Sequence, residues 1–95
     1  MIIDVIKPGS VVTIKLTSGE ELIASFMGES DYHYELHKVM VIAMGQQGPG
    51  LMPYLFTAPH DAKIKLNKGT VSVITSSDAE FAKQYMQSTT SISLI

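Results

Sequence analysis

Four side chains that could bind a ligand or exchange a proton recur at every second position of the segment DYHYELH. They are Asp31, His33, Glu35 and His37. The residues between them are Tyr32, Tyr34 and Leu36. Because a strand points alternate side chains to opposite faces, the polar set should face water or a ligand and the other set the core. This alternation is the pattern in the chain most typical of a binding site.

Two of these side chains, His33 and His37, have a spacing that suggests a metal pair. On a strand their separation is about 13 Å, which is too far for two imidazoles to share one ion. The chain has no cysteine, and the sequence places no third ligand for a shared ion. We therefore expect no metal and no cofactor. There is also no G-x-S-x-G motif and no Gly-rich phosphate loop before a helix, so we expect no enzyme activity.

Positive charge gathers at Lys63, Lys65 and Lys68. Such a cluster is either a solvated strand face or a track for phosphates, and both interpretations stay open. The whole chain has a net charge of −2 and seven lysines, with no arginine. Nucleic-acid-binding domains usually carry a basic surplus, and arginine is the better bidentate phosphate ligand. Any nucleic-acid binding must therefore be local.

Most of the elements that would position these groups are predicted strands. Residues 11–17 alternate as a half-buried strand does, with the apolar positions at Val12, Ile14 and Leu16. Gly19 suits the positive φ of a short hairpin turn. A second strand over 21–29 is apolar on both faces, and its small residues Ala24 and Gly28 would let it bend to close a small barrel.

Two later segments, 38–44 and 51–58, are apolar at both parities, as in strands covered on both faces. Pro53 places the second segment at an edge or a bulge. Residues 51–58 carry no charge, and an uncovered apolar edge favours pairing with another copy. We therefore expect a homo-oligomer. Residues 1–6 would form a short strand or an arm that packs on another element.

The last elements are predicted from alternation and turn residues. Lysines alternate with apolar residues over 63–66, a tight turn follows at 67–69, and Val71 begins the last strand. A helix is expected over 77–89, where Ser77 and Glu80 have the spacing of a capping box.

Together these elements predict an all-β fold in a single domain of residues 1–95. It would be a strongly bent, five-stranded antiparallel barrel over about 9–75, followed by the C-terminal helix. A generic SH3-like or OB barrel has the same strand count and curvature. The sequence contains no transmembrane segment and no signal peptide, so we expect a cytoplasmic protein without membrane contact.

Two motifs resemble those of the Sm and Sm-like (LSm, Hfq-like) family of ring-forming, RNA-binding barrels, over about residues 9–75. The first comprises Val12, Ile14, Leu16, Gly19, Ala24, Phe26 and the segment Asp31 to Leu36. The second comprises Leu66, Asn67, Lys68, Gly69, Val71 and Ile74. The overall pattern looks most like small Sm-like proteins of marine tailed phages, especially cyanophages. The family's helix is usually N-terminal, whereas the helix predicted here is C-terminal.

The resemblance implies an SH3-like Sm barrel and a cyclic ring of about five to seven subunits, closed through the edge strands 51–58 and 70–75. It also implies a nucleotide site. In that site His33 would stack on a base, Glu35 would contact the base edge, Asn67 or Lys68 would close the pocket, and Asp31 would orient its loop. Lys63 and Lys65 would add phosphate contacts, and Tyr32 could stack. Glu35 stands where the family has asparagine, and a carboxylate only accepts hydrogen bonds.

Two functions from different classes follow. The first is a ring-forming Sm-like protein that binds RNA or single-stranded DNA and acts in RNA or DNA processing. The second is a structural or adaptor oligomer of phage origin that binds no nucleic acid, which the acidic composition and Glu35 favour. In the phage case the protein would work in the cytoplasm of the host.

Overall fold

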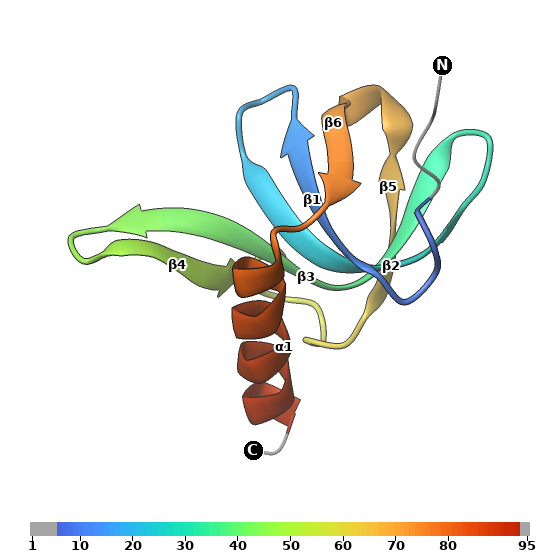
Figure 1. Cartoon of the computed structure of the whole chain (residues 1–95). Coiled ribbons are helices and arrows are strands. Elements are labelled where there is room, and N and C mark those ends of the chain that lie inside the picture. The colour runs from blue at the N-terminus through green and yellow to red at the C-terminus, as the bar shows by residue number, and fades with distance from the viewer. Residues whose placement is uncertain (1–5, 94–95) are drawn as a thin grey trace.

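The computed structural model describes the backbone of residues 6–93 and the side chains of residues 6–89. Figure 1 shows its strands and C-terminal helix in chain order. The elements are β1 (Val11–Leu16), β2 (Glu21–Glu29), β3 (His33–Gly45), β4 (Gly48–Pro53), β5 (Lys63–Asn67), the short 3₁₀ helix η1 (Lys68–Thr70), β6 (Val71–Ser76) and α1 (Ala79–Ser93). Of the arm expected at residues 1–6, all but Ile6 lies outside the described residues.

The strands form one antiparallel sheet in the order β4–β3–β2–β1–β6. β5 lies off this order and pairs with the first half of β3, whereas β4 pairs with the second half. The prediction of an all-β fold with a C-terminal helix is confirmed, with six strands instead of five. The sheet curls strongly (Figure 1) but stays open, since β5 and β6 do not pair with each other in the described part of the chain. Consequently β4, β5 and β6 each have a free edge.

The β1–β2 hairpin forms as its alternation predicts. The apolar positions of β1 are buried, and Gly19 has a φ of 108° in the connecting turn. Other residues are strained at this φ, so glycine lets the chain reverse here. The buried side chains form a first core inside the curled sheet, made by Val12, Ile14, Leu16, Leu22, Ala24, Phe26 and Leu36.

β3 begins earlier than the strand predicted at 38–44, and it bends at Lys38. Its first half pairs with β5, and its second half, from Met40 onward, pairs with β4. Where the pairing with β2 shifts register, between Ile23 and Ser25, Lys38 has a φ of 52°. This bulge turns the second half of β3 away from the curled sheet. As a result β3 and β4 project together as a long hairpin, at the left of Figure 1.

The strand expected at 51–58 is shifted toward the N-terminus and ends at Pro53, and residues 54–62 form a loop before β5. The backbone N–H of Tyr54 donates to the carbonyl of Val39 at 3.1 Å, which fixes the side of β4 that faces β3. Alternate residues of a strand point their N–H groups to opposite sides. The N–H groups missing at Pro49 and Pro53 would therefore point away from β3, so these prolines leave the hairpin ladder intact.

α1 covers the projecting hairpin through a second core, in which Ile23, Met40 and Tyr85 are buried. Tyr85 is fully buried, and its hydroxyl donates to the carbonyl of Lys38 at 2.7 Å. The same hydroxyl lies 3.2 Å from Ser25 Oγ. Burial raises the pKa of the Tyr85 hydroxyl. Tyr85 thus supplies a partner for a carbonyl at the β3 bulge and attaches the helix at the point where the sheet bends.

α1 spans Ala79–Ser93, so it starts and ends later than the predicted 77–89. The predicted capping box at Ser77 is wrong. Asp78 Oδ2 accepts hydrogen bonds from the N–H groups of Glu80 at 3.0 Å and Phe81 at 3.4 Å, and so caps the helix. The Ser77 hydroxyl instead lies 2.8 Å from that of Thr13 on β1. Among the described residues, no helix is long and apolar enough to cross a membrane.

Candidate nucleic-acid interface

The pairing of β3 with β5 sets six polar side chains on one surface, here called the β3–β5 polar face. Three cross-strand pairs form it: His33 with Asn67, Glu35 with Lys65, and His37 with Lys63. Directly opposed residues of antiparallel strands have Cβ atoms about 5 Å apart, so each pair can contact one ligand. The glutamate, the lysines and the asparagine are exposed and the two histidines are half-buried.

The residues between these positions point inward. Leu36 is buried, and Tyr34, Ile64 and Leu66 pack against the first core. For residues 33–37 the predicted alternation of a polar face and a core face is therefore confirmed. The core fixes the two strands, and the strands in turn fix the spacing of the polar side chains.

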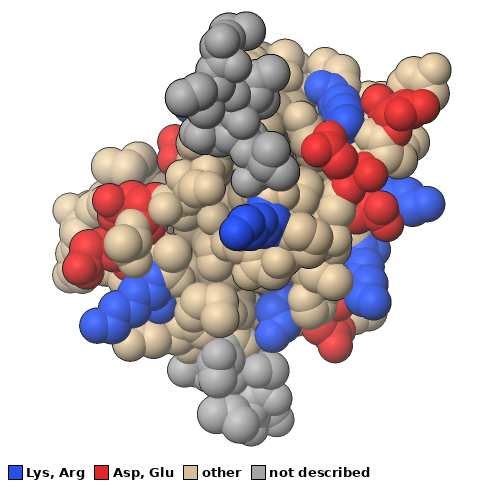
Figure 2. All heavy atoms as spheres, turned by 45° about the vertical axis from the view of Figure 1, so that its right-hand side comes forward, with Lys and Arg blue, Asp and Glu red and all other residues tan. Residues whose placement is uncertain are grey.

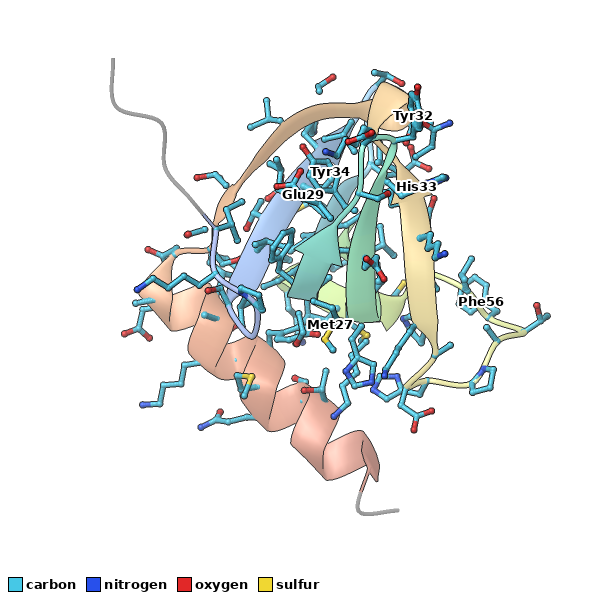
Figure 3. All side chains as sticks on the ribbon, turned by 90° about the vertical axis from the view of Figure 1, so that its right-hand side faces the viewer. Met27, Glu29, Tyr32, His33, Tyr34 and Phe56 are labelled. Atoms are coloured by element: carbon cyan, nitrogen blue, oxygen red, sulfur yellow. The ribbon has the colours of Figure 1, made fainter. Side chains whose placement is uncertain are left out.

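Asp31 and Tyr32 form the tight turn between β2 and β3. The N–H of Ser30 donates to the carbonyl of His33 at 2.9 Å, and the N–H of Lys68 donates to the carbonyl of Tyr32 at 2.8 Å. The β2–β3 turn and the start of η1 thus lie side by side, as Figure 3 shows near Tyr32 and His33. Tyr32 is 75% exposed, so its ring is available to a ligand instead of belonging to the core.

Lys68 points away from the β3–β5 polar face. Its Nζ is 2.5 Å from Glu29 Oε2 and 5.0 Å from the centre of the Tyr34 ring, which faces the core. The hydrogen bond to the Glu29 carboxylate raises the pKa of Lys68, and the negative charge of Asp31 adds to this effect. The positive charge of Lys68 is thus already paired with a carboxylate. Lys68 therefore stabilises the β2–β3 turn instead of offering a free charge to a phosphate.

The eight residues predicted from the sequence therefore separate into two groups. His33, Glu35, Lys63, Lys65 and Asn67 come together on the β3–β5 polar face, where His37 joins them. Asp31, Tyr32 and Lys68 lie at the adjacent turn. Sequence reasoning missed Glu29, because its partner Lys68 is 39 positions away and no local pattern links the two.

The side chains of Asn67 and Glu35 have distinct hydrogen-bonding capacity. Asn67 Oδ1 accepts a hydrogen bond from the N–H of Gly69 at 2.8 Å and caps η1, which leaves the amide nitrogen as a donor. The Glu35 carboxylate lies beside Gly28, where a Cβ would be 3.9 Å from Oε2. The face can thus donate through Asn67 and accept through Glu35.

Charges of both signs are interspersed on the surface in Figure 2, with no continuous basic area on the side shown. Within the described residues Lys68–Glu29 is the single ion pair, so the ammonium groups of Lys63 and Lys65 have no carboxylate within 4.0 Å there. The same part of the chain contains no cluster of three side chains suited to hold a metal ion. The exposed cations of the β3–β5 polar face are therefore these two lysines, spaced two residues apart on one strand.

The chain matches no protein-family model and no curated protein sequence.

Proposed function

We propose that the chain is an Sm-like protein that assembles with copies of itself and binds single-stranded nucleic acid on the β3–β5 polar face. The observation that carries this proposal is the set of three cross-strand pairs, which aligns two imidazoles, two unpaired ammonium groups and an amide on one surface. A single strand offers repeated phosphates and flat bases, and this set of groups can contact both.

Each group has a role in this proposal. Lys63 and Lys65 contact successive phosphates, while His33 and the exposed ring of Tyr32 stack on bases. The Asn67 amide nitrogen donates to a base edge. Glu35 accepts from an exocyclic amino group, as acidic side chains do from cytosine, so a base with an amino group is preferred over uracil.

Support for the Sm-like fold comes from where its two sequence motifs lie. The turn that follows the first motif and the 3₁₀ segment of the second are adjacent, joined by the hydrogen bond from Lys68 N to Tyr32 O at 2.8 Å. In the Sm-like family the corresponding loops meet to form the nucleotide site. The strongly bent antiparallel sheet agrees with this assignment.

The free edges indicate how copies would join. On β4 the outward positions are Pro49, Leu51 and Pro53, so Leu51 alone has an outward N–H. β5 and β6 contain no proline, and their outward N–H groups are intact. Assembly therefore proceeds by pairing β6 of one copy with β5 of the next, instead of through the segment 51–58. Repetition of this contact closes a ring of about five to seven copies.

The binding test uses fluorescently labelled RNA and DNA homopolymers and measures anisotropy at several salt concentrations. We expect binding to weaken with salt, and the K63A/K65A variant to lose affinity and about 1.4 of the log–log salt slope per subunit, as two phosphate contacts imply for a single strand. Lys83→Ala on α1 is the matched control. Absence of binding at low salt to every homopolymer rejects the proposal.

The alternative function, an adaptor oligomer without nucleic acid, is favoured by two observations: the Glu29 carboxylate pairs with Lys68, and Glu35 places a negative charge among the proposed contacts. Such an oligomer would use the same β5 and β6 edges. Affinity capture that returns a protein partner, and no nuclease-sensitive material, supports this alternative.

A further inference from the structure

We propose that a second copy of the chain docks its loop 54–62, through Leu55 and Phe56, against the start of α1 and the adjacent end of β6. This inference rests on the assembly of β6 with β5 proposed above. It adds a contact between side chains to the pairing of backbone edges.

The docking loop leads into β5, at one edge of the curled sheet. Figure 3 shows Phe56 projecting beyond β5, on the opposite side of the molecule from α1. Phe56 is 75% exposed and Leu55 is 44% exposed. The surrounding residues 45–59 include no charged side chain. Large apolar side chains exposed together on an uncharged loop are typical of a surface that meets another protein.

The receiving surface lies beside the other edge strand of the curled sheet, β6. A hollow of about 340 Å³ is formed there by Thr13, Glu21, Thr75, Ser76, Asp78 and Phe81. Phe81 is 39% exposed at the start of α1, and Val73 on β6 is 55% exposed. The hollow thus combines an apolar ring with two carboxylates. Neither carboxylate belongs to an ion pair among the described residues, although Lys15 is the cross-strand partner of Glu21.

Charge favours one direction for the pairing of the two edges. In an antiparallel arrangement Lys63, at the start of β5, lies beside the end of β6, next to the carboxylates of Asp78 and Glu21. The attraction between these opposite charges across the interface favours the antiparallel arrangement.

The antiparallel direction also decides where the loop goes. Residues 54–62 directly precede Lys63, so they continue past the end of β6 and over the start of α1. One choice of direction therefore pairs the charges and brings Phe56 of one copy to Phe81 of the next. Because the two surfaces lie at opposite edges of the curled sheet, different surfaces of the two copies meet and the contact is head-to-tail.

The chain has no cysteine, so single introduced cysteines can test this contact. Phe56→Cys and Phe81→Cys variants are mixed and oxidised, and the products are separated without reductant. We expect a covalent dimer that contains one copy of each variant. A mixture of Ser18→Cys, in the β1–β2 turn, with Phe81→Cys is the matched control and should give none.

A second measurement gives the contribution of the Phe56 contact to the stability of the oligomer. Light scattering over a dilution series should show that Phe56→Ala raises the concentration of half-dissociation about tenfold or more, as loss of an aromatic anchor does. Met44→Ala removes another exposed apolar side chain, at the tip of the β3–β4 hairpin, and should change nothing.

An oligomer that shows no cross-link and an unchanged dissociation in Phe56→Ala overturns the docking but leaves the β6–β5 assembly standing. A wild-type chain that is monomeric at micromolar concentration rejects both.

Discussion

The curled sheet and the projecting hairpin with α1 are held together in different ways. The first core gathers side chains from neighbouring strands joined by short turns, and β1 places every second side chain in it. The second core joins β2, β3 and a helix from the far end of the chain, and a single tyrosine makes its polar contacts with the sheet. Local pattern therefore specifies the first part, whereas the second depends on a distant partner.

The largest effect is expected from the first core. Leu36→Ala removes a fully buried side chain of β3 and should lower the free energy of unfolding by about 2–5 kcal/mol. Urea denaturation followed by circular dichroism measures the loss. Met44→Ala, on the same strand but 78% exposed, is the control and should stay near wild type. Equal effects of the two variants would contradict the assignment of Leu36 to the core.

A smaller and more local effect is expected at the attachment of the helix. Tyr85→Phe keeps the ring but leaves the Lys38 carbonyl without its side-chain partner, which should cost about 1–3 kcal/mol. Hydrogen exchange should accelerate in β4 and α1 more than in β1 and β2. Met86→Ala, a half-exposed neighbour on the same helix, serves for comparison. Uniform acceleration over all strands would mean that the two parts unfold as one unit.

The Tyr85 pKa gives the same attachment a pH dependence. Its folded-state pKa is raised above the ordinary value of about 10 by burial, so its contribution is complete below pH 10 and is lost as pH rises through the folded value. We expect wild-type stability to fall more steeply than that of Tyr85→Phe above about pH 10. Thermal unfolding from pH 8 to 11 compares the two chains. If their unfolding temperatures fell in parallel with rising pH, the hydroxyl would not be buried.

The smallest effect is expected at Asp78, which caps the start of α1. Asp78→Ala should cost about 1 kcal/mol, because two N–H groups of the first turn lose their acceptor. Asp78→Asn keeps that acceptor and should recover most of the loss. Urea denaturation of these two variants and of Ser77→Ala ranks the three by the stability that each loses. If Ser77→Ala were the most harmful of the three, Ser77 would be the true cap.

The sequence was sufficient where neighbours along the chain decide the structure. The alternation at Val12, Ile14 and Leu16, the turn glycine Gly19 and the polar alternation at 33–37 are all found as predicted. Each depends on a period of two residues or on the conformational freedom of one residue. The same period of two places five of the predicted site residues on one surface, once the register of β3 and β5 is known. These residues are His33, Glu35, Lys63, Lys65 and Asn67.

The sequence was insufficient where residues far apart meet. At the bend, the partner of the Lys38 carbonyl is Tyr85, 47 positions later, and the ion-pair partner of Lys68 is Glu29, 39 positions earlier. The capping prediction failed for a similar reason, since Thr13 on β1 engages the Ser77 hydroxyl and Asp78 takes its place. The distant partners Tyr85, Glu29 and Thr13 are not marked by any local pattern, so they could only be found in three dimensions.

The short connection between β5 and β6 has a consequence for the shape of an assembly. η1 is three residues long, with Asn67 capping its start and Thr70 Oγ1 bonded to the Asn67 carbonyl at 2.7 Å. The two edges that would meet neighbouring copies are thus set at a fixed angle by a rigid piece of one chain. In the proposed assembly the turn from one copy to the next would therefore be determined inside each subunit. A joint of this kind favours one closed size over a distribution of sizes, and lengthening η1 by a flexible insertion would be the direct way to lose that uniformity.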